Sequence, residues 1–184
     1  MPIIDFHTHC FPDALAPRAM AQLTINAAVC GYVPHTDGTT TGLIASMDAA
    51  GVDRSVVCNI VTNARQMHKV NEFALETARD YPRLIPLGSF HPDAPASELE
   101  AEADRLIAGG IPGIKIHPDI QAFPIDDPRM MQTYALCEER GLPILMHTGD
   151  YRYDFSNPNR LIPVLEQFKN LTVIGAHMGG WSLW

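Results

Sequence analysis

Short apolar runs alternate along the chain with segments that have the periodicity of a helix. Six runs rich in β-branched residues are predicted to be strands: 3–6, 55–60, 84–90, 113–116, 144–146 and 172–176. Their apolar residues are continuous rather than alternating with polar ones, which is typical of parallel strands buried on both faces. The pattern therefore predicts a parallel sheet.

Helices are predicted between these strands, over 63–81, 95–108 and 128–140. Each has apolar residues at helical spacing, and glycines follow the second and the third. The segment after Pro158 is ambiguous, because Pro163 would interrupt a helix that began at Pro158. A helix that starts at Pro163 is the alternative for this segment.

The spacing of the strands indicates the class of fold. Successive strands from the third onward begin about 28–31 residues apart, the length of one βα unit. The first unit is longer, because a Pro-, Gly- and Thr-rich segment at 11–41 is inserted, which we predict to be a loop. Repeated βα units predict an α/β fold of the (β/α)8 TIM-barrel type, although a full barrel has eight strands and this chain has about six units. We therefore expect one incomplete barrel domain over 1–184, with an open, doubly wound six-stranded sheet as the alternative.

Composition and charge exclude several classes of protein. The chain of 184 residues is 46% hydrophobic and 18% charged, which is typical of a folded domain and not of a disordered chain. Its net charge of −8 is a poor match for nucleic acid or an anionic membrane. The four cysteines, Cys10, Cys30, Cys58 and Cys137, are scattered, and no basic residues precede the apolar residues at the N-terminus, so we expect no secretory signal. We therefore expect reduced thiols and a cytoplasmic protein.

Histidines stand at the ends of four predicted strands. His7 and His9 close the first strand, and the period of two places both side chains on one face, where they can chelate one metal ion. His117, His147 and His177 end the fourth, fifth and sixth strands at intervals of 30 residues. Because the carboxyl ends of barrel strands meet at one mouth, these imidazoles are expected to lie together.

The motifs around these histidines resemble the amidohydrolase superfamily, in particular its amidohydrolase-related branch of hydrolases and aminocarboxymuconate-type decarboxylases. The resemblance covers the whole chain: Ile-Asp-Phe-His-Thr-His, Gly-Ile-Lys-Ile-His-Pro, Met-His-Thr-Gly-Asp and Ala-His-Met-Gly-Gly-Trp stand at the first, fourth, fifth and sixth strands. It implies that His7, His9 and His147 bind a divalent metal ion, usually zinc. It also implies that His177 lies beside the metal as a ligand or as a catalytic residue.

The sequence departs from this branch because no residue matches the aspartate of the eighth strand, which binds the metal and handles protons. We expect from this that the chain is part of a longer protein. We also expect that residues 1–184 alone form oligomers or aggregate and have little or no activity.

Further residues are candidates for binding the substrate. Lys115 lies on the same predicted face as His117, and both are assigned to this role. In binuclear relatives a fourth-strand lysine is carboxylated and bridges two metals; we favour instead a lysine that supports the mouth or binds a substrate carboxylate. Arg152 can pair with an anionic substrate group, or with the neighbouring aspartates. Trp181 is expected to form a wall of the site.

Three imidazoles and a carboxylate suit zinc and leave a position for water, whose pKa zinc lowers from 15.7 to about 7. The leading hypothesis is a metal-dependent hydrolase that uses this water on a small carbon–nitrogen or carbon–oxygen substrate. A non-oxidative decarboxylase of a small carboxylic acid is the alternative, and an inactive metal-binding fragment is a further one. A phosphoesterase is weaker, because related barrels place a glutamate at the fourth strand. We expect a small-molecule substrate and no nucleic-acid or membrane partner, and leave a homo-oligomer open.

Overall fold

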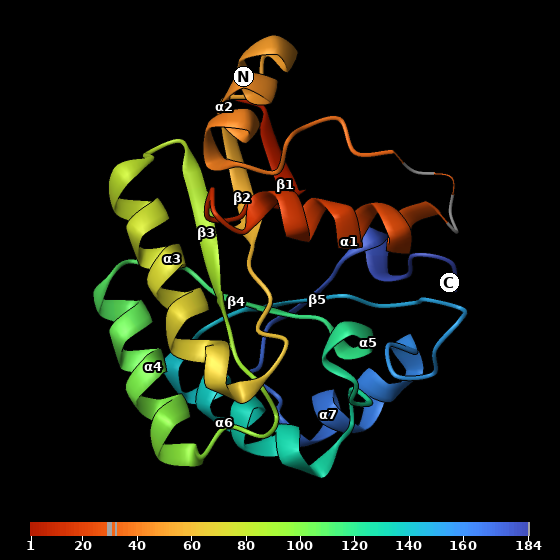
Figure 1. Ribbon diagram of the computed structural model, residues 1–184. Helices are drawn as coiled ribbons and strands as arrows, with labels where there is room; N and C mark the ends of the chain where they lie inside the picture. Colours follow the sequence, from red (N-terminus) through yellow and green to blue (C-terminus); the bar gives the residue numbers. More distant parts are fainter. Residues whose placement is uncertain (29–30, 32, 184) are drawn as a thin grey trace. The chain divides into compact units, whose positions relative to one another are not determined.

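The computed structural model describes residues 1–28, 31 and 33–183 (Figure 1). It divides into two compact units, which are described here one at a time. The first unit contains Met1–Cys58 and Tyr81–Ile85. The second contains Asn59–Asp80 and Pro86–Trp184.

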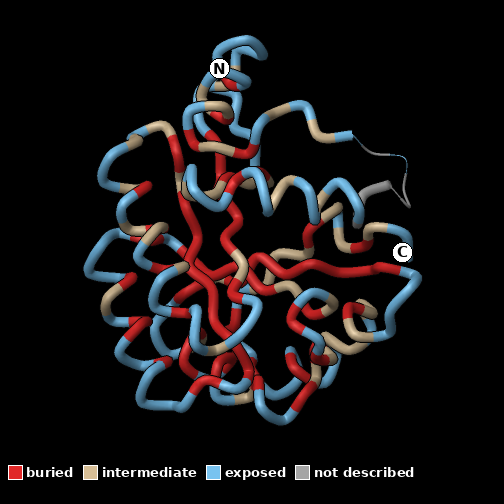
Figure 2. The backbone as a smooth tube through the Cα atoms, in the orientation of Figure 1, coloured by how far each residue is buried: buried red, intermediate tan, exposed pale blue. Residues whose placement is uncertain are grey.

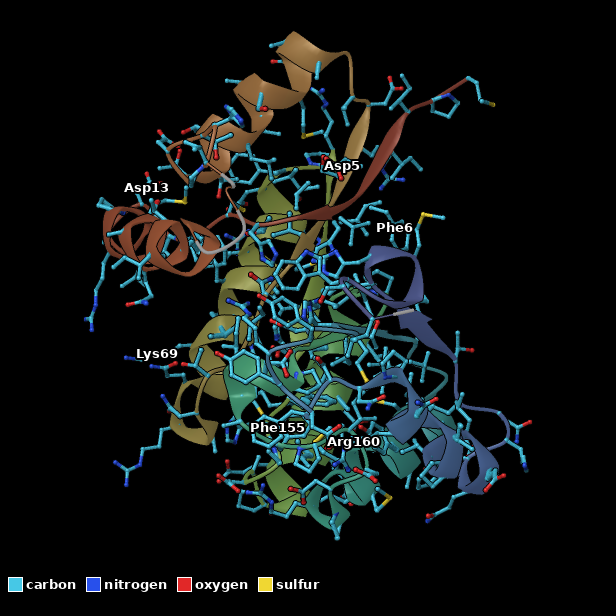
Figure 3. All side chains as sticks on the ribbon, turned by 90° about the vertical axis from the view of Figure 1, so that its right-hand side faces the viewer. Asp5, Phe6, Asp13, Lys69, Phe155 and Arg160 are labelled. Carbon is cyan, nitrogen blue, oxygen red and sulfur yellow. The ribbon has the colours of Figure 1, made fainter. Side chains whose placement is uncertain are left out.

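The first unit is built on two parallel strands and two helices. Its elements are β1 (Ile4–Thr8), α1 (Ala16–Ala28), α2 (Thr40–Ala50) and β2 (Arg54–Cys58), followed by the start of β3 (Leu84–Ser89). The register of β1 and β2 is irregular between Asp5 and Thr8. Phe6, labelled with Asp5 on β1 in Figure 3, is 53% exposed, so β1 is not buried on both faces as the sequence predicted. The apolar run at 3–6 therefore predicted the strand correctly, but its expected burial on both faces was wrong.

The inserted segment 11–41 differs from the predicted loop, because it contains α1 and the start of α2. Ala, Met and Leu in 16–23 favour a helix, although the ends of the segment are rich in turn-forming residues. Thr39 caps α2, because its hydroxyl accepts a hydrogen bond of 2.9 Å from the N–H of Gly42. Residues 29, 30 and 32, and with them the expected thiol of Cys30, lie outside the described residues.

The second unit repeats a βα pattern. In chain order its elements are η1 (Ala64–Gln66), α3 (Met67–Asp80), the end of β3, α4 (Ala96–Ala108), β4 (Ile114–Ile116), α5 (Pro118–Gln121), η2 (Pro128–Met130), α6 (Met131–Arg140), β5 (Ile144–Met146), η3 (Pro158–Arg160), α7 (Leu161–Gln167), β6 (Val173–Gly175) and η4 (His177–Gly179). Here η denotes a short 3-10 helix. The predicted helices over 63–81, 95–108 and 128–140 are thus present.

The strands of this unit are all parallel and follow one another in chain order, β3-β4-β5-β6. A doubly wound sheet reverses its strand order at a switch point, and no reversal occurs here. Sequential parallel strands joined by helices are instead the arrangement of a (β/α)8 barrel. The predicted α/β fold of TIM-barrel type is confirmed, and all six predicted strands are present.

The core of the second unit lies between its strands and its helices, and the buried backbone is red in Figure 2. Helix α4 packs against both α3 and α6. It buries Leu99, Ala103 and Leu106, three of the four residues that the helical period predicted, whereas the fourth, Ile107, is 41% exposed. Because the helices cover the apolar strands from outside, the carboxyl ends of the strands are left to carry polar side chains.

Helix α7 begins at Leu161 rather than at Pro163, the start that the sequence had left as the alternative. Pro163 lies in the first turn, where a missing backbone N–H costs no helical hydrogen bond. The interruption expected from this proline is therefore absent.

Among the described residues, no helix is long and apolar enough to cross a membrane. The described cysteines, Cys10, Cys58 and Cys137, are buried, and the thiols of Cys10 and Cys137 are free.

Candidate functional site

In the first unit, the two histidines of β1 lie close to each other. The ring centroids of His7 and His9 are 5.3 Å apart. The Nδ1 atom of His9 lies 2.8 Å from the backbone oxygen of Cys58. A carbonyl only accepts a hydrogen bond, so Nδ1 carries the proton and Nε2 of the neutral ring carries the lone pair. This tautomer, held by a carbonyl, is the one that a metal-binding histidine typically has.

In the second unit, the residues that follow β4 and β5 form a compact cluster. The rings of His117 and His147 are stacked, with centroids 3.9 Å apart and planes 9° apart. The Nε2 atom of His147 lies 3.4 Å from Oδ2 of Asp119. Potential ligand atoms of His117, Asp119 and His147 all lie within 4.8 Å of one another.

His177 joins this cluster from the turn after β6. Its Nε2 atom lies 3.1 Å from Nδ1 of His147, and the two rings meet edge to face with centroids 4.9 Å apart. The sheet register places Gly175 beside Met146, so Ala176 is level with His147 and His177 is one residue further on. His177 and Met178 both have φ near +57°, in the left-handed region. This turn brings the His177 ring back to His147 despite the offset.

Lys115 supplies positive charge next to these rings. Its side chain is fully buried on β4. Burial lowers the pKa of His147 to about 3, and the charges of Lys115 and His177 act in the same direction. Burial and the charge of Lys115 also lower the pKa of His177. Both imidazoles are therefore neutral at pH 7 and can offer lone pairs.

Two aspartates beside the cluster differ in their environments. Burial raises the pKa of Asp119 to about 6; the charge of Asp150 acts in the same direction, and the nearby polar groups of Ser156 act against it. Burial also raises the pKa of Asp150, but hydrogen bonds from Arg152 outweigh it, and the net shift is downward. Asp150 is thus the ionised partner of an arginine, while Asp119 is a buried carboxyl beside imidazoles.

Arg152 is held by this partner and by aromatic rings. Its Nε donates to Oδ1 of Asp150 at 2.9 Å, and a terminal nitrogen donates to Oδ2 at 2.6 Å. The guanidinium carbon lies 5.2 Å from the ring centroid of Trp181. The pairing with a neighbouring aspartate that the sequence left open is therefore present, and the binding of a substrate by Arg152 stays a prediction.

The loops after β5 and β6 are joined by backbone contacts. The N–H of Trp181 donates to the oxygen of Thr148 at 2.9 Å, and the N–H of Ser182 donates to the oxygen of Gly149 at 2.7 Å. Gly149 has φ of +82°, and a Cβ on it would lie 2.6 Å from Cα of Gly180. The absence of a side chain at this position permits the close approach that fixes Trp181, 6.2 Å from the ring of His147.

The sequence thus predicted most of the cluster but missed one member. His117, His147 and His177 lie together, and Lys115 and Trp181 are beside them. His7 and His9 belong to the first unit, so their convergence with His147 stays a prediction. Asp119 was not predicted; its only signal was the motif His117-Pro118-Asp119, which repeats His91-Pro92-Asp93.

The donors present fit a divalent metal ion. The tautomer of His9, with its lone pair on Nε2, is suited to bind one. In the second unit, two imidazoles and a carboxylate face one another. No described residue forms a hydrogen bond with Nε2 of His147 or with either carboxylate oxygen of Asp119. Histidine and carboxylate ligands together are typical of zinc and related metals.

Sequential parallel strands with polar residues at their carboxyl ends define a barrel protein whose site lies at the strand ends. The family is shown by sequence: a family profile described as amidohydrolase matches residues 4–183. The chain therefore belongs to the amidohydrolase family, as its motifs indicated.

Solved structures support the same fold. An uncharacterized TIM-barrel protein from Bordetella bronchiseptica is 25% identical, with a TM-score of 0.74, over 95% of this chain and 66% of that one. A 5-carboxyvanillate decarboxylase from Sphingomonas paucimobilis is 18% identical, with a TM-score of 0.69, over 97% of this chain and 68% of that one. A 5-carboxyvanillate decarboxylase from Novosphingobium aromaticivorans with bound manganese is 15% identical, with a TM-score of 0.71, over 97% and 66%. This chain thus spans about two thirds of the length of the proteins it matches.

Proposed function

We propose that the protein is a metal-dependent enzyme that hydrolyses a small molecule at a carbon–nitrogen or carbon–oxygen bond. One observation carries the proposal: imidazoles and a buried carboxylate meet at the ends of adjacent parallel strands in a member of the amidohydrolase family. A divalent ion, for which we propose zinc, would act as a Lewis acid and lower the pKa of a water molecule.

The histidines are proposed to divide the work. His7, His9 and His147 hold the metal, as the family resemblance implies. His177 is the catalytic residue that moves a proton at the reacting atoms; its place 3.1 Å from His147 supports this role. His7 and His9 belong to the first unit, so the second unit bears only on His147 and His177, which lie close together.

The substrate is proposed to lie against the residues around this cluster. His117 and Lys115 stand at the end of β4, and Trp181 lies beside the ring of His147. Asp150 aligns the guanidinium of Arg152 with the face of Trp181. A planar, anionic substrate group would fit next to such a guanidinium.

A non-oxidative decarboxylase of a small carboxylic acid is the second candidate. It is favoured by the names of similar solved structures, since two of those described above are 5-carboxyvanillate decarboxylases. The same imidazoles can hold a metal that binds a carboxylate, so the ligands alone serve either reaction.

We also propose that the protein acts in the cytoplasm on small molecules and without nucleic-acid or membrane partners. The net charge of −8 and the free, buried thiols of Cys10 and Cys137 support this proposal.

The test is an assay of a full-length version of the protein, loaded with Zn²⁺ or with Mn²⁺, because residues 1–184 alone are expected to have little or no activity. Small amides, esters and lactones are followed for hydrolysis, and hydroxybenzoates are followed for release of carbon dioxide. We expect hydrolysis that chelation abolishes and metal restores. Release of carbon dioxide without hydrolysis would favour the second candidate. A chain that binds no metal would contradict both.

A further inference from the structure

The carboxyl ends of β4 and β5 carry a group of three residues, and the proposed ligand set uses only one of them. His147 belongs to that set, but Asp119 does not, and His117 was assigned only to the substrate. All three residues belong to the second unit. The N–H of His147 donates to the oxygen of Ile116 at 3.0 Å, so paired strands fix their relative positions.

We infer that His117, Asp119 and His147 form a divalent-cation site that does not require the histidines of β1. The inference shares His147 with the proposed function and deepens it, because it places metal ligands within the second unit alone. The ligand it names is a bare divalent metal ion of the zinc type.

Burial without hydrogen bonds is the first argument. The side chain of Asp119 is 3% exposed, and that of His147 is 8% exposed. No described group donates to either oxygen of Asp119 in hydrogen-bonding geometry, and Nε2 of His147 also has no such partner. A buried polar atom that forms no hydrogen bond destabilises the folded state, so native proteins usually supply a partner, such as an ion.

The distance between these two atoms is the second argument. Nε2 of His147 and Oδ2 of Asp119 are 3.4 Å apart. This separation is longer than the roughly 2.7–3.2 Å of an N–H···O hydrogen bond. Two ligand atoms each about 2.1 Å from a tetrahedral zinc ion lie about 3.4 Å from each other. The spacing therefore fits two ligands of one ion better than a donor and its acceptor.

The third ligand and the tautomer of His147 agree with this reading. A nitrogen of His117 lies within 4.8 Å of the other two atoms, so a small adjustment of its ring closes the set. The contact of His117 with Ile120 is long, 3.4 Å from the N–H of Ile120 to Nδ1 of His117. In His147, a metal on Nε2 places the proton on Nδ1, which can then donate to Nε2 of His177 at 3.1 Å.

The test measures metal binding rather than turnover. The whole chain is stripped with a chelator and titrated with Zn²⁺ by calorimetry and with Co²⁺ by visible absorption. Three proteins decide the result: the wild type, a variant with His7→Ala and His9→Ala, and the same variant with Asp119→Asn added. Asp104→Asn is the matched control, because Asp104 is exposed and pairs with Arg140.

We expect the variant without the β1 histidines to bind one equivalent of Zn²⁺ and to give a Co²⁺ absorption band. Adding Asp119→Asn should raise the dissociation constant at least about 100-fold, beyond the 10–100-fold typical of losing an outer-shell partner. Asp104→Asn should leave it unchanged. If circular dichroism shows that the Asp119→Asn protein does not fold, His117→Ala in the same background decides in its place.

Three results would overturn the inference. Zinc bound by the wild type but not by the variant without the β1 histidines would refute this site and leave the proposed function intact. Equal zinc affinity with and without Asp119→Asn would show that the carboxylate is not a ligand. Absence of zinc from the wild type would contradict the proposed function as well as the site.

Discussion

Gly149 provides the sharpest test of how the loops after β5 and β6 hold the site. Its φ of +82° lies in the left-handed region, and an added Cβ would lie 2.6 Å from Cα of Gly180 and 2.8 Å from the backbone nitrogen of Trp181. Both contacts are with backbone, which cannot rotate away as a flexible side chain can. Gly149→Ala should therefore suffer from strain and from overpacking.

The magnitude follows from these two effects. A left-handed alanine costs about 1–2 kcal/mol, and overpacking a close contact typically costs about 1–3 kcal/mol more. Gly110 is the matched control, because its φ is +78° and a Cβ there meets no atom within 4 Å. Gly110→Ala should therefore show the first cost without the second.

Thermal unfolding followed by circular dichroism measures the difference. For a chain of this size, 1 kcal/mol shifts the midpoint by about 2–4 °C, so Gly149→Ala should melt roughly 2–12 °C below Gly110→Ala. Equal midpoints for the two variants would refute the close approach of the loops around Gly149.

Three further predictions concern hydrogen bonds, pH and the histidines. Tyr134→Phe removes a buried hydroxyl that donates to the oxygen of Ile125 at 2.6 Å and should lower the free energy of unfolding by about 1 kcal/mol in a denaturant titration; an unchanged value would contradict this. Burial raises the pKa of Glu102, but hydrogen bonds from Arg105, Asn71 and His68 outweigh it and lower the pKa below its ordinary value of 4.5. Because the folded pKa is the lower one, this contribution to stability is present above pH 4.5 and disappears as the pH falls through the folded pKa, so Glu102→Gln should flatten the acid limb of a stability–pH curve; an equally steep limb in the variant would count against it. Under the proposed function, His7→Ala and His147→Ala in a full-length version should remove most of the metal and the activity, whereas His177→Ala should keep metal better than activity; elemental analysis beside a turnover assay decides, and equal loss of metal in all three would make His177 a plain ligand.

The strands and the helices of the second unit were predictable because their signals are local. A short, buried run of β-branched residues predicts a strand. The helical spacing of Leu99, Ala103 and Leu106 predicts the buried face of α4. Helix α1 was missed because the turn-forming residues at both ends of 11–41 dominate a helix-favouring middle. The composition of the whole segment 11–41 thus concealed the helix-favouring residues at 16–23, which a shorter window would have shown.

The spacing of the strands predicted which histidines of the site lie together, but not the backbone geometry that brings them together. The 30-residue interval correctly indicated that His147 and His177 lie together, but the sheet register pairs residues 29 apart between β5 and β6, as in Ile144 with Val173. The ring of His177 reaches its neighbour through two left-handed residues, a feature that spacing does not encode. The contact was right, and the assumed geometry behind it was wrong.

Asp119 could not be found by periodicity, because α5 has only four residues. Its carboxyl reaches the cluster because His117 stands at the N-cap of α5 and Pro118 begins the helix, so that Asp119 follows within the first turn. A histidine at the end of a strand, followed by proline and aspartate, is therefore worth testing as a sequence pattern. It predicts that the aspartate side chain lies beside the carboxyl end of the strand that precedes it.

The whole cluster depends on His147, and for that reason a substitution of His147 is a poor test of which residues bind the metal. Its ring stacks on His117, its Nδ1 faces His177, and its Nε2 faces Asp119, so one imidazole connects the ends of three strands. His147→Ala would remove a ligand, open a cavity and leave a buried carboxylate without its neighbour, and loss of metal could follow from any of these changes. Asp119→Asn keeps the volume and the stacked rings while it removes the ionised oxygen. The carboxylate, rather than the central histidine, therefore separates a metal site from a packed cluster of rings.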